Sequence, residues 1–225
     1  MELNKWRLYL VTEQTLSNGR TTPEVVKEAI DGGIDVIQLR EKNLSKRQKY
    51  QIGLKIKKLI KNKNVDLIIN DDIDIALALD SKGVHLGSGD LPIKIARKLL
   101  GKNKIIGKSS YNLNEAIKAV KNGADYLGFG AVFNTKSKKL SQERLAVGLK
   151  QLKKVSNNVS IPVVAIGGIK STNMINVFKN GASCVALISE ITQAENIKKK
   201  VEELKNIINN NLLNGGKYEK YTGKN

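Results

Sequence analysis

The stretch LNEAIKAVKNGADYLGF, residues 113–129, contains the pattern that decides the fold. From Leu113 to Lys121 the apolar residues recur at helical spacing, and Asn122-Gly123 ends that helix. The apolar run from Tyr126 to Phe129 then predicts a buried strand. Residues 180–183, Asn-Gly-Ala-Ser, repeat this junction, because they also close a helix with glycine and enter a strand. One helix–strand unit is therefore expected to recur along the chain.

Eight such units are found from one end of the sequence to the other. The expected strands are Trp6 to Val11, Asp35 to Leu39, Asp66 to Ile69, Val84 to Leu86, Lys104 to Gly107, Tyr126 to Phe129, Pro162 to Ile166 and Cys184 to Leu187. The first expected helix has Thr22 as its N-cap and Pro23 at its first position, and it stops at Gly32-Gly33. The other expected helices are Ser45 to Ile60, Ile73 to Leu79, Pro92 to Leu100, Leu113 to Lys121, Leu145 to Lys154, Thr172 to Lys179 and Ala194 to Leu213.

Strands that alternate with helices indicate parallel pairing through right-handed crossovers. Eight units of about 28 residues each predict an α/β fold of the (β/α)8 TIM barrel type, as a single domain over residues 1–213. A doubly wound open sheet is the alternative, but no G-x-G-x-x-G fingerprint follows the first strand. Residues 214–225 are polar and are expected to form a frayed tail.

Composition excludes several classes of protein. Of the 225 residues 40% are hydrophobic and 27% are charged, which is enough apolar material for a sizeable core. No run approaches the roughly 18 consecutive apolar residues of a membrane span, so we expect no membrane association. The single cysteine, Cys184, excludes an intrachain disulfide and a zinc site built on paired cysteines. Residues 1–10 lack the apolar core of a secretory signal, and a cytoplasmic location is expected.

The charge balance indicates anionic ligands. Lys and Arg number 39 against 21 Asp and Glu, a net charge of +18 that attracts anions. Nucleic acid is not expected as a partner, because the lysines are spread over nearly every helix and aromatic residues make up only 4% of the chain. The simplest explanation of most of this charge is composition, with lysines on solvated helix faces.

In a barrel of this type the site lies at the carboxyl ends of the strands. The second strand ends in Gln38-Leu39-Arg40-Glu41-Lys42. Because an extended chain has a period of two residues, Gln38, Arg40 and Lys42 are expected on one face. That face carries an amide and two cations, which suit a phosphate-bearing ligand.

Carboxylates follow the next two strands. Asn70-Asp71-Asp72 comes after the third strand, and Asp90 follows the fourth. Two carboxylates from adjacent strands can share Mg2+, which keeps waters and substrate phosphate oxygens as its other ligands. Helix capping is the competing explanation, since Asp71 or Asp72 could cap the third helix and Asp90 could cap the fourth.

The later strands end in small and polar residues. Ser109 follows the fifth strand, and a polar loop at residues 133–139 follows the sixth, where it forms either a mobile lid over an anion or a plain solvated loop. Gly167-Gly168 after the seventh strand and Ser189 after the eighth predict a phosphate site. The only histidine, His85, is expected to be a core or supporting residue rather than an acid or base.

Taken together and in this order, five segments resemble the thiamine-phosphate synthase (thiamin phosphate pyrophosphorylase) family. The resemblance runs from about Leu8 to Ile191. The segments are Gln38-Leu39-Arg40-Glu41-Lys42, Asn70-Asp71-Asp72, Gly83-Val84-His85-Leu86-Gly87 with Asp90, Gly123-Ala124-Asp125-Tyr126-Leu127-Gly128, and Ala165-Ile166-Gly167-Gly168-Ile169.

The resemblance implies a transferase that joins hydroxymethylpyrimidine pyrophosphate to hydroxyethylthiazole phosphate, with Mg2+ as cofactor, through a stabilised pyrimidine cation. It implies that Asp71 and Asp90 bind the metal. The pyrophosphate would be held by Arg40, Lys42 and Lys138, with Ser109 beside this leaving group. The pyrimidine would be held by Gln38 and Asn70. The thiazole phosphate would be held by Thr135, Ser137, Gly168, Ile188 and Ser189. A homo-oligomer is possible.

The chain departs from the family pattern at several positions. Gly87-Ser88-Gly89-Asp90 replaces Gly-Gln-x-Asp and loses an amide, while residues 134–138 lack a proline but keep both hydroxyls and the lysine. Lys108 replaces a small apolar residue, and Tyr111 replaces a histidine. Two alternatives remain: a thiazole tautomerase-like isomerase, which would lack the aspartate pair and keep that histidine, and a non-catalytic polyanion-binding barrel.

Overall fold

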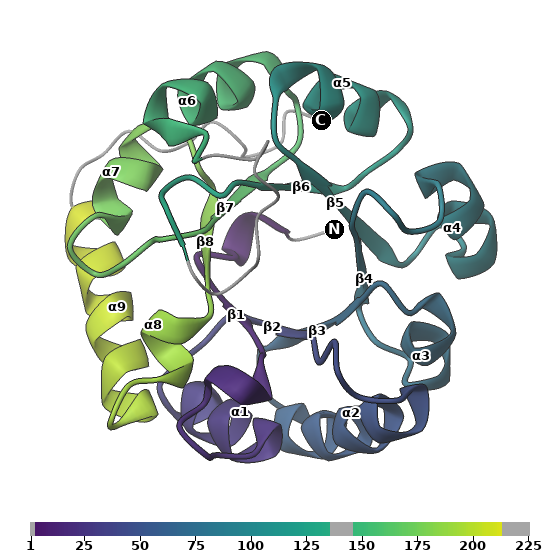
Figure 1. Cartoon of the computed structure of the whole chain (residues 1–225), viewed down its shortest axis with the longest axis vertical. Helices are drawn as coiled ribbons and strands as arrows, with labels where there is room; N and C mark the ends of the chain where they lie inside the picture. Colours follow the sequence, from purple (N-terminus) through teal and green to yellow (C-terminus); the bar gives the residue numbers. More distant parts are fainter. Residues whose placement is uncertain (1–2, 136–145, 213–225) are drawn as a thin grey trace.

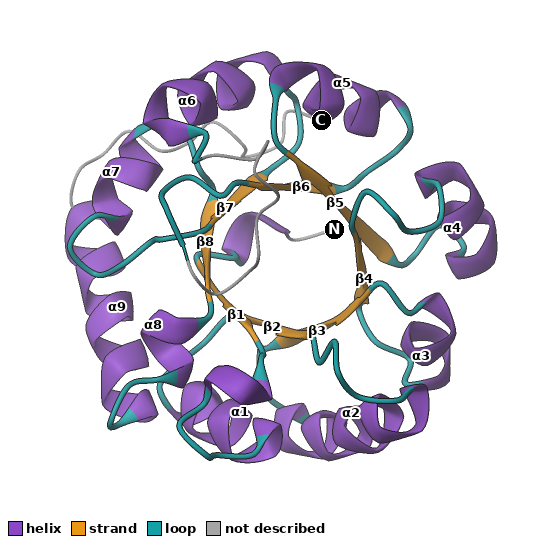
Figure 2. Ribbon diagram, viewed as in Figure 1, coloured by secondary structure: helices purple, strands orange, loops and turns teal. Residues whose placement is uncertain are grey.

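The computed structural model describes residues 3–135 and 146–212 and shows a closed barrel of eight parallel strands with helices outside it (Figures 1 and 2). The strands run in sequence order around the barrel. Their bounds are β1 Leu8–Val11, β2 Val36–Leu39, β3 Asp66–Asn70, β4 Gly83–Leu86, β5 Ile105–Ser110, β6 Tyr126–Phe129, β7 Val163–Ile166 and β8 Cys184–Leu187.

Figure 2 shows the helices as an outer ring around the strands. Their bounds are α1 Thr22–Asp31, α2 Lys46–Ile60, α3 Ile73–Ala78, α4 Ile93–Leu100, α5 Leu113–Lys121, α6 Gly148–Asn158, α7 Met174–Lys179, α8 Ser189–Thr192 and α9 Ile197–Leu212. Two short 3-10 turns, η1 Leu3–Lys5 and η2 Gln14–Leu16, flank β1. No helix in the described ranges combines the length and the apolar character that crossing a membrane requires.

The strand pairing confirms the barrel and excludes the open sheet. β1 pairs in parallel with β2, where Leu10 lies opposite Ile37, and also with β8, where Leu10 lies opposite Leu187. Because the first strand pairs with the last, the sheet has no edge strand and closes on itself. All eight strand carboxyl ends therefore open at the same mouth.

Alternating side chains along each strand divide the core into two layers. One set packs outward against the helices, and Leu8, Leu10, Ile37 and Ile69 belong to it. The other set fills the barrel interior, which contains Leu3, Trp6, Tyr9, Val11, Val36, Ile68, Ile105, Tyr126, Val164, Cys184 and Ala186. The interior is thus packed below the mouth, and Cys184 is one of its small buried residues.

Several predicted helix boundaries were wrong by a few residues. The N-cap of α1 is Thr21, in a capping box with Glu24, because the Thr22 hydroxyl instead donates to Glu41 Oε1 at 2.6 Å. The sixth helix begins at Gly148 and runs four residues beyond the expected end, while the expected start at Leu145 lies outside the described residues. The short helix α8 was not predicted, and α9 begins later than Ala194.

At the face opposite the mouth, the carboxylate of Asp35 joins three elements. Asp35 Oδ2 accepts hydrogen bonds from the backbone N–H groups of Arg7 at 2.9 Å and Leu8 at 2.8 Å. Asp35 Oδ1 pairs with Lys205 of α9 at 2.6 Å. These bonds join the first strand, the second strand and the last helix where the barrel closes, so this face serves stability and leaves the mouth for chemistry.

Candidate active site

A cavity of about 780 Å3 opens at the carboxyl ends of the strands. It is lined by residues that follow or end each of the eight strands. The predicted site residues that line it are Gln38, Arg40, Lys42, Asn70, Asp71, Asp90, Ser109, Thr135, Gly168, Ile188 and Ser189. Ser137 and Lys138 lie outside the described residues. The fold therefore brings these eleven residues to one cavity, while their roles remain predictions.

The cations of the second strand become more exposed toward the mouth. Gln38 is only 5% exposed, whereas the side chains of Arg40 and Lys42 are 12% and 52% exposed. The intervening Glu41 faces outward, where it accepts bonds from Thr22 and from the backbone of Gln14 at 2.9 Å. This alternation confirms that the amide and the two cations share the inward face.

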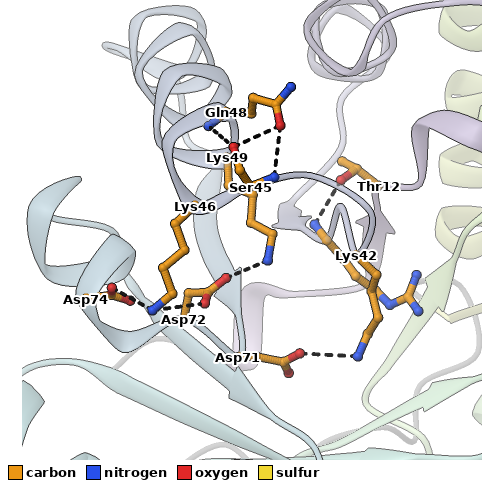
Figure 3. A network of polar contacts seen from close by, with 10 residues as sticks. Thr12, Lys42, Ser45, Lys46, Gln48, Lys49, Asp71, Asp72 and Asp74 are labelled. Carbon is orange, nitrogen blue, oxygen red and sulfur yellow. Dashed lines mark hydrogen bonds and ion pairs between the residues drawn. The ribbon is translucent and has the colours of Figure 1, made fainter.

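Arg40 is anchored at both of its ends. Its backbone N–H donates to Thr12 Oγ1 at 2.9 Å, a bond drawn in Figure 3. Its guanidinium donates to Glu13 Oε2 at 2.6 Å, and the other oxygen of Glu13 accepts from the Thr15 hydroxyl at 2.8 Å. A guanidinium with one side occupied by Glu13 keeps its remaining N–H groups for a ligand. The loop after β1 therefore orients the main cation of the site.

The two predicted metal-binding carboxylates meet at the mouth. Asp71 and Asp90 are close enough to share a hydrogen bond, and Asp71 also pairs with Lys42 at 3.3 Å (Figure 3). Burial disfavours the charge of Asp71, but the bond from Asp90 and the charge of Lys42 prevail and lower its pKa. Burial, followed by the bond to Asp71, raises the pKa of Asp90. Two acids in contact need a proton or a cation between them.

The capping explanation is wrong for these acids. No side-chain capping bond is made at the start of α3, where Asp72 is the N-cap residue, or of α4, where Pro92 is. Asp72 does not line the cavity, and Figure 3 shows it pointing to Lys46 and Lys49, with which it forms ion pairs of 3.6 and 2.8 Å. Asp71, with a left-handed φ of 63°, turns toward the cavity instead.

Asp90 is held by its own loop and by a neighbouring strand. Its carboxylate accepts from the backbone N–H of Gly87 at 2.6 Å. Lys108, which the sequence left unexplained, donates from β5 to the carbonyl oxygen of the same Gly87. Burial lowers the pKa of Lys108, while Asp90 and Asp71 act in the opposite direction. The Gly87–Asp90 loop is therefore fastened from both sides.

Glycines shape the opposite side of the cavity. A Cβ on Gly167 would lie 2.4 Å from Ala131 Cβ, and one on Gly168 would lie 2.5 Å from the carbonyl oxygen of Asn134. Both residues also have positive φ, 100° and 63°, so larger residues there would be strained as well as crowded. The chain after β7 thereby packs directly against the chain after β6, beside Ser189 and the start of α8.

The floor of the cavity is a hydrogen-bonded set of polar side chains that includes two tyrosines the sequence did not indicate. Tyr126 OH lies 3.1 Å from Tyr9 OH and 3.0 Å from His85 Nδ1. His85 Nε2 lies 3.0 Å from Ser109 Oγ, and Gln38 Nε2 donates to Tyr9 OH at 2.8 Å. His85 is thus a supporting residue for a predicted site residue, as expected. The two tyrosines were not expected, because each occupies a mid-barrel strand position that resembles ordinary core.

A sequence model of the family described as thiamine monophosphate synthase matches residues 8–191. A thiamine-phosphate synthase of Haloarcula marismortui is 47% identical over 191 residues, which are 84% of this chain and 90% of that protein. The chain belongs to the thiamine monophosphate synthase family. One member from Clostridium acetobutylicum is 45% identical over 206 residues, which are 92% of this chain and 96% of that protein.

Solved structures agree with the family assignment. The thiamine phosphate pyrophosphorylase of Pyrococcus furiosus has a TM-score of 0.85 at 41% identity, covering 93% of this chain and 98% of that one. A 3-hexulose-6-phosphate synthase, with a TM-score of 0.66 at 15% identity, shares the barrel fold alone. The resemblance to thiamine-phosphate synthases between Leu8 and Ile191 is confirmed, and the barrel is that of a transferase family.

The residues of this thiamine monophosphate synthase family member suit the metal that the family implies. In the parts of the chain that the structure describes, no three His, Cys, Asp or Glu side chains gather as a complete metal site. Asp71 and Asp90 nevertheless meet at the mouth, and Lys42, which pairs with Asp71 at 3.3 Å, neutralises only part of the charge that two carboxylates can carry. Mg2+ needs only one or two carboxylates when substrate phosphate completes its shell, so this donor set fits it.

Proposed function

We propose that this family member condenses 4-amino-2-methyl-5-hydroxymethylpyrimidine pyrophosphate with hydroxyethylthiazole phosphate to give thiamine phosphate and pyrophosphate. The observation that carries the proposal is the contact between Asp71 and Asp90 in the cavity where Arg40 and Lys42 end. Paired acids next to cations suit a metal-bound diphosphate, which supplies negative charge to the cations and oxygen ligands to the metal.

The chemistry asked of these residues is the neutralisation of charge on a leaving group. When the bond from the pyrimidine methylene carbon to oxygen breaks, its electron pair goes to the diphosphate, and the thiazole nitrogen forms the new bond to that carbon. Arg40 and Lys42 lie where they would stabilise this charge, and Lys138 joins them in the proposal. Mg2+, held by Asp71 and Asp90, would supply the same electrostatic stabilisation. No protein nucleophile is required.

The substrates are assigned to different parts of the cavity. Gln38 and Asn70 end neighbouring strands and would contact the pyrimidine, with Ser109 beside its leaving group. The opposite wall, where glycines bring the backbone close, would hold the thiazole phosphate. The residues proposed there are Thr135, Ser137, Gly168, Ile188 and Ser189. Under this assignment the two anionic groups would occupy separate sides of one cavity.

The proposal concerns small-molecule partners in a cytoplasmic enzyme. The cations that line the cavity lie in a concave site together with acidic and neutral polar residues, which suits phosphate esters better than a polymer. Assembly into a homo-oligomer stays a prediction.

The decisive experiment is synthesis of thiamine phosphate from the two substrates with Mg2+ or with EDTA. We expect turnover that EDTA abolishes and that Asp90→Ala and Lys138→Ala each lower severely. Turnover that survives both chelation and loss of Asp90 would remove the metal from the proposal. Metal-independent isomerisation of the thiazole phosphate would favour a tautomerase, and nucleic-acid binding with a steep salt dependence and no turnover would favour a non-catalytic barrel.

A further inference from the structure

Five side chains from five strands form one continuous hydrogen-bonded chain across the cavity floor. In order they are Gln38 of β2, Tyr9 of β1, Tyr126 of β6, His85 of β4 and Ser109 of β5. The four links measure 2.8, 3.1, 3.0 and 3.0 Å. Gln38 and Ser109 both line the cavity, so the chain has a ligand-facing residue at each end.

The direction of the chain is set at the glutamine end. Gln38 Nε2 carries only donor hydrogens, so Tyr9 OH accepts from it. Tyr9 is fully buried, and among the described residues its hydroxyl bonds only to Gln38 and Tyr126. Burial raises the pKa of Tyr9, so the hydroxyl keeps its proton. That proton must be donated to Tyr126, because a buried donor without an acceptor is costly.

The direction then passes to the histidine. Tyr126 accepts from Tyr9 and uses its own proton to donate to His85 Nδ1. Burial also raises the pKa of Tyr126, so this proton too is present. A neutral imidazole that accepts at Nδ1 carries its hydrogen at Nε2. His85 Nε2 therefore donates to Ser109 Oγ, and the hydroxyl hydrogen of Ser109 is directed away from the ring.

We propose that Tyr9, Tyr126 and His85 are positioning residues that fix the Nε2–H tautomer of His85 and thereby present Ser109 to the substrate as a hydrogen-bond donor. At the other end the same direction leaves Gln38 Oε1 as an acceptor facing the cavity. Resting on the proposed function, Ser109 donates to the departing diphosphate, and Gln38 accepts from the pyrimidine amino group. The floor then supports charge development at one end and orients the ring at the other.

The surrounding packing leaves this set little freedom. A Cβ on Gly107 would lie 2.1 Å from Tyr126 Cζ, and one on Gly128 would lie 2.6 Å from His85 Cε1. Trp6 packs edge-on against both tyrosines, with ring centroids 5.8 Å from Tyr9 and 5.5 Å from Tyr126. Gly107, Gly128 and Trp6 thus leave the rings of Tyr9, Tyr126 and His85 no space to move apart. The direction of the hydrogen bonds can therefore change only if the protons change position.

The opposite direction of the hydrogen-bonded chain predicts the other tautomer of His85. If the carboxamide of Gln38 were turned over, its oxygen would accept from Tyr9, and each later link would reverse. His85 would then carry its hydrogen at Nδ1, and Ser109 would donate to the ring instead of to a ligand. The position of one hydrogen on one ring therefore distinguishes the two arrangements.

Because the sequence contains a single histidine, this position is directly measurable. The full chain is labelled with 15N-histidine, and the ring nitrogens are observed by NMR without substrate at a pH at which the ring is neutral. We expect Nε2 to be the protonated nitrogen. A protonated Nδ1, or a mixture of the two tautomers, in the unchanged protein would overturn the proposal.

A remote variant tests whether the tyrosine sets the direction. Tyr9→Phe removes one hydroxyl that is two hydrogen bonds away from the histidine ring and leaves both bonds of that ring in place. We expect both tautomers to appear and kcat to fall about tenfold, with KM for the thiazole phosphate unchanged. The control Tyr50→Phe removes the same atom from the exposed face of α2 and should change neither quantity. An unchanged tautomer in Tyr9→Phe would refute the role of Tyr9.

The two proposals fail separately. The tautomer measurement uses no substrate, so a wrong tautomer leaves the proposed synthesis standing. The expected tautomer in a protein without synthase turnover would remove the proposed function and leave the direction of the hydrogen bonds intact.

Discussion

Replacing Asp90 by asparagine should stabilise the metal-free protein while it removes metal binding. Two like charges about 4 Å apart repel by about 4 kcal/mol at an effective dielectric constant of about 20. This figure must be reduced, because the Asp71 side chain is 26% exposed and Lys42 lies 3.3 Å from it. Burial also raises the pKa of Asp90, which lessens its charge. We expect Asp90→Asn to increase the free energy of unfolding by about 1 kcal/mol.

The substitution is conservative in shape, which isolates the effect of charge. The amide oxygen of asparagine can still accept the 2.6 Å bond from the Gly87 backbone, so the loop keeps its conformation. Asp31→Asn is the matched control, since Asp31 pairs with Lys27 in an exposed i,i+4 arrangement on α1. That pair is worth less than about 0.5 kcal/mol, and its loss should leave metal binding unchanged.

Urea unfolding with EDTA, and then with Mg2+ plus pyrophosphate, measures both effects. The unchanged protein should gain about 2.7 kcal/mol when the ligand exceeds its Kd about 100-fold, and Asp90→Asn should gain much less. Lower stability of Asp90→Asn in EDTA would show that the two carboxyl groups do not repel each other. An equal gain with Mg2+ would show that Asp90 is not a metal ligand.

Three further substitutions test other parts of the site. Arg40→Lys should raise KM for the pyrimidine diphosphate about tenfold or more and leave KM for the thiazole phosphate unchanged, because an ammonium lacks the forked donors that let a guanidinium bond Glu13 and a phosphate together. Steady-state kinetics with each substrate varied in turn measures both constants. Lys108→Met removes the donor to the Gly87 carbonyl and should raise the Mg2+ concentration for half-maximal activity severalfold, whereas Lys108→Arg should restore most of the affinity. Gly107→Ala should cost about 3 kcal/mol or more in the free energy of unfolding by crowding a buried ring, whereas Gly89→Ala, which meets nothing within 4 Å, should stay within about 0.5 kcal/mol in the same denaturation assay.

The barrel could be predicted from the sequence because its signals are local and repeated. Each strand is a short apolar run, each helix has apolar spacing, and glycine marks many of the junctions. The errors lie at helix ends, where one contact decides the outcome. Thr22 has the residue type of an N-cap, but its hydroxyl is used by Glu41, which is distant in sequence, and Thr21 takes the cap instead.

The charged part of the site was also predictable, because the carboxyl ends of all strands in a parallel barrel meet at one mouth. This holds whichever partners the individual side chains have. Gln38, Arg40 and Asp71 were placed correctly at the cavity by this rule. Partner residues were not predictable in the same way. Glu13 follows the first strand, but nothing in the sequence indicates that it bonds to Arg40. Lys108 lies on the outward face of its strand, and its bond to the Gly87 carbonyl is evident only once the position of the neighbouring loop is known.

The hydrogen-bonded floor was missed for a different reason. Tyr9 and Tyr126 lie within apolar strands, where a tyrosine reads as a large core residue. The available signal was their polarity, because a tyrosine buried in a barrel interior usually needs a partner for its hydroxyl. Only the register of the closed barrel shows that the two hydroxyls bond to each other, and that their other partners are Gln38 and His85.

The inward-facing residues that end and follow β2 predict one orientation for the pyrimidine diphosphate of the proposed reaction. Gln38 is the last inward-facing residue of β2, and Arg40 and Lys42 follow it in the segment that leads to the mouth, so the three form a series from the floor to the mouth. Exposure rises along it from 5% for the residue Gln38 to 12% and 52% for the side chains of Arg40 and Lys42, because burying an unpaired charge costs far more than burying an amide. A substrate with a neutral ring and a charged tail can satisfy this gradient only with its ring on the floor. The reversed orientation would bury the diphosphate among the residues of the floor. It would also place the neutral ring against Arg40, where the ring cannot replace the water that the guanidinium has lost.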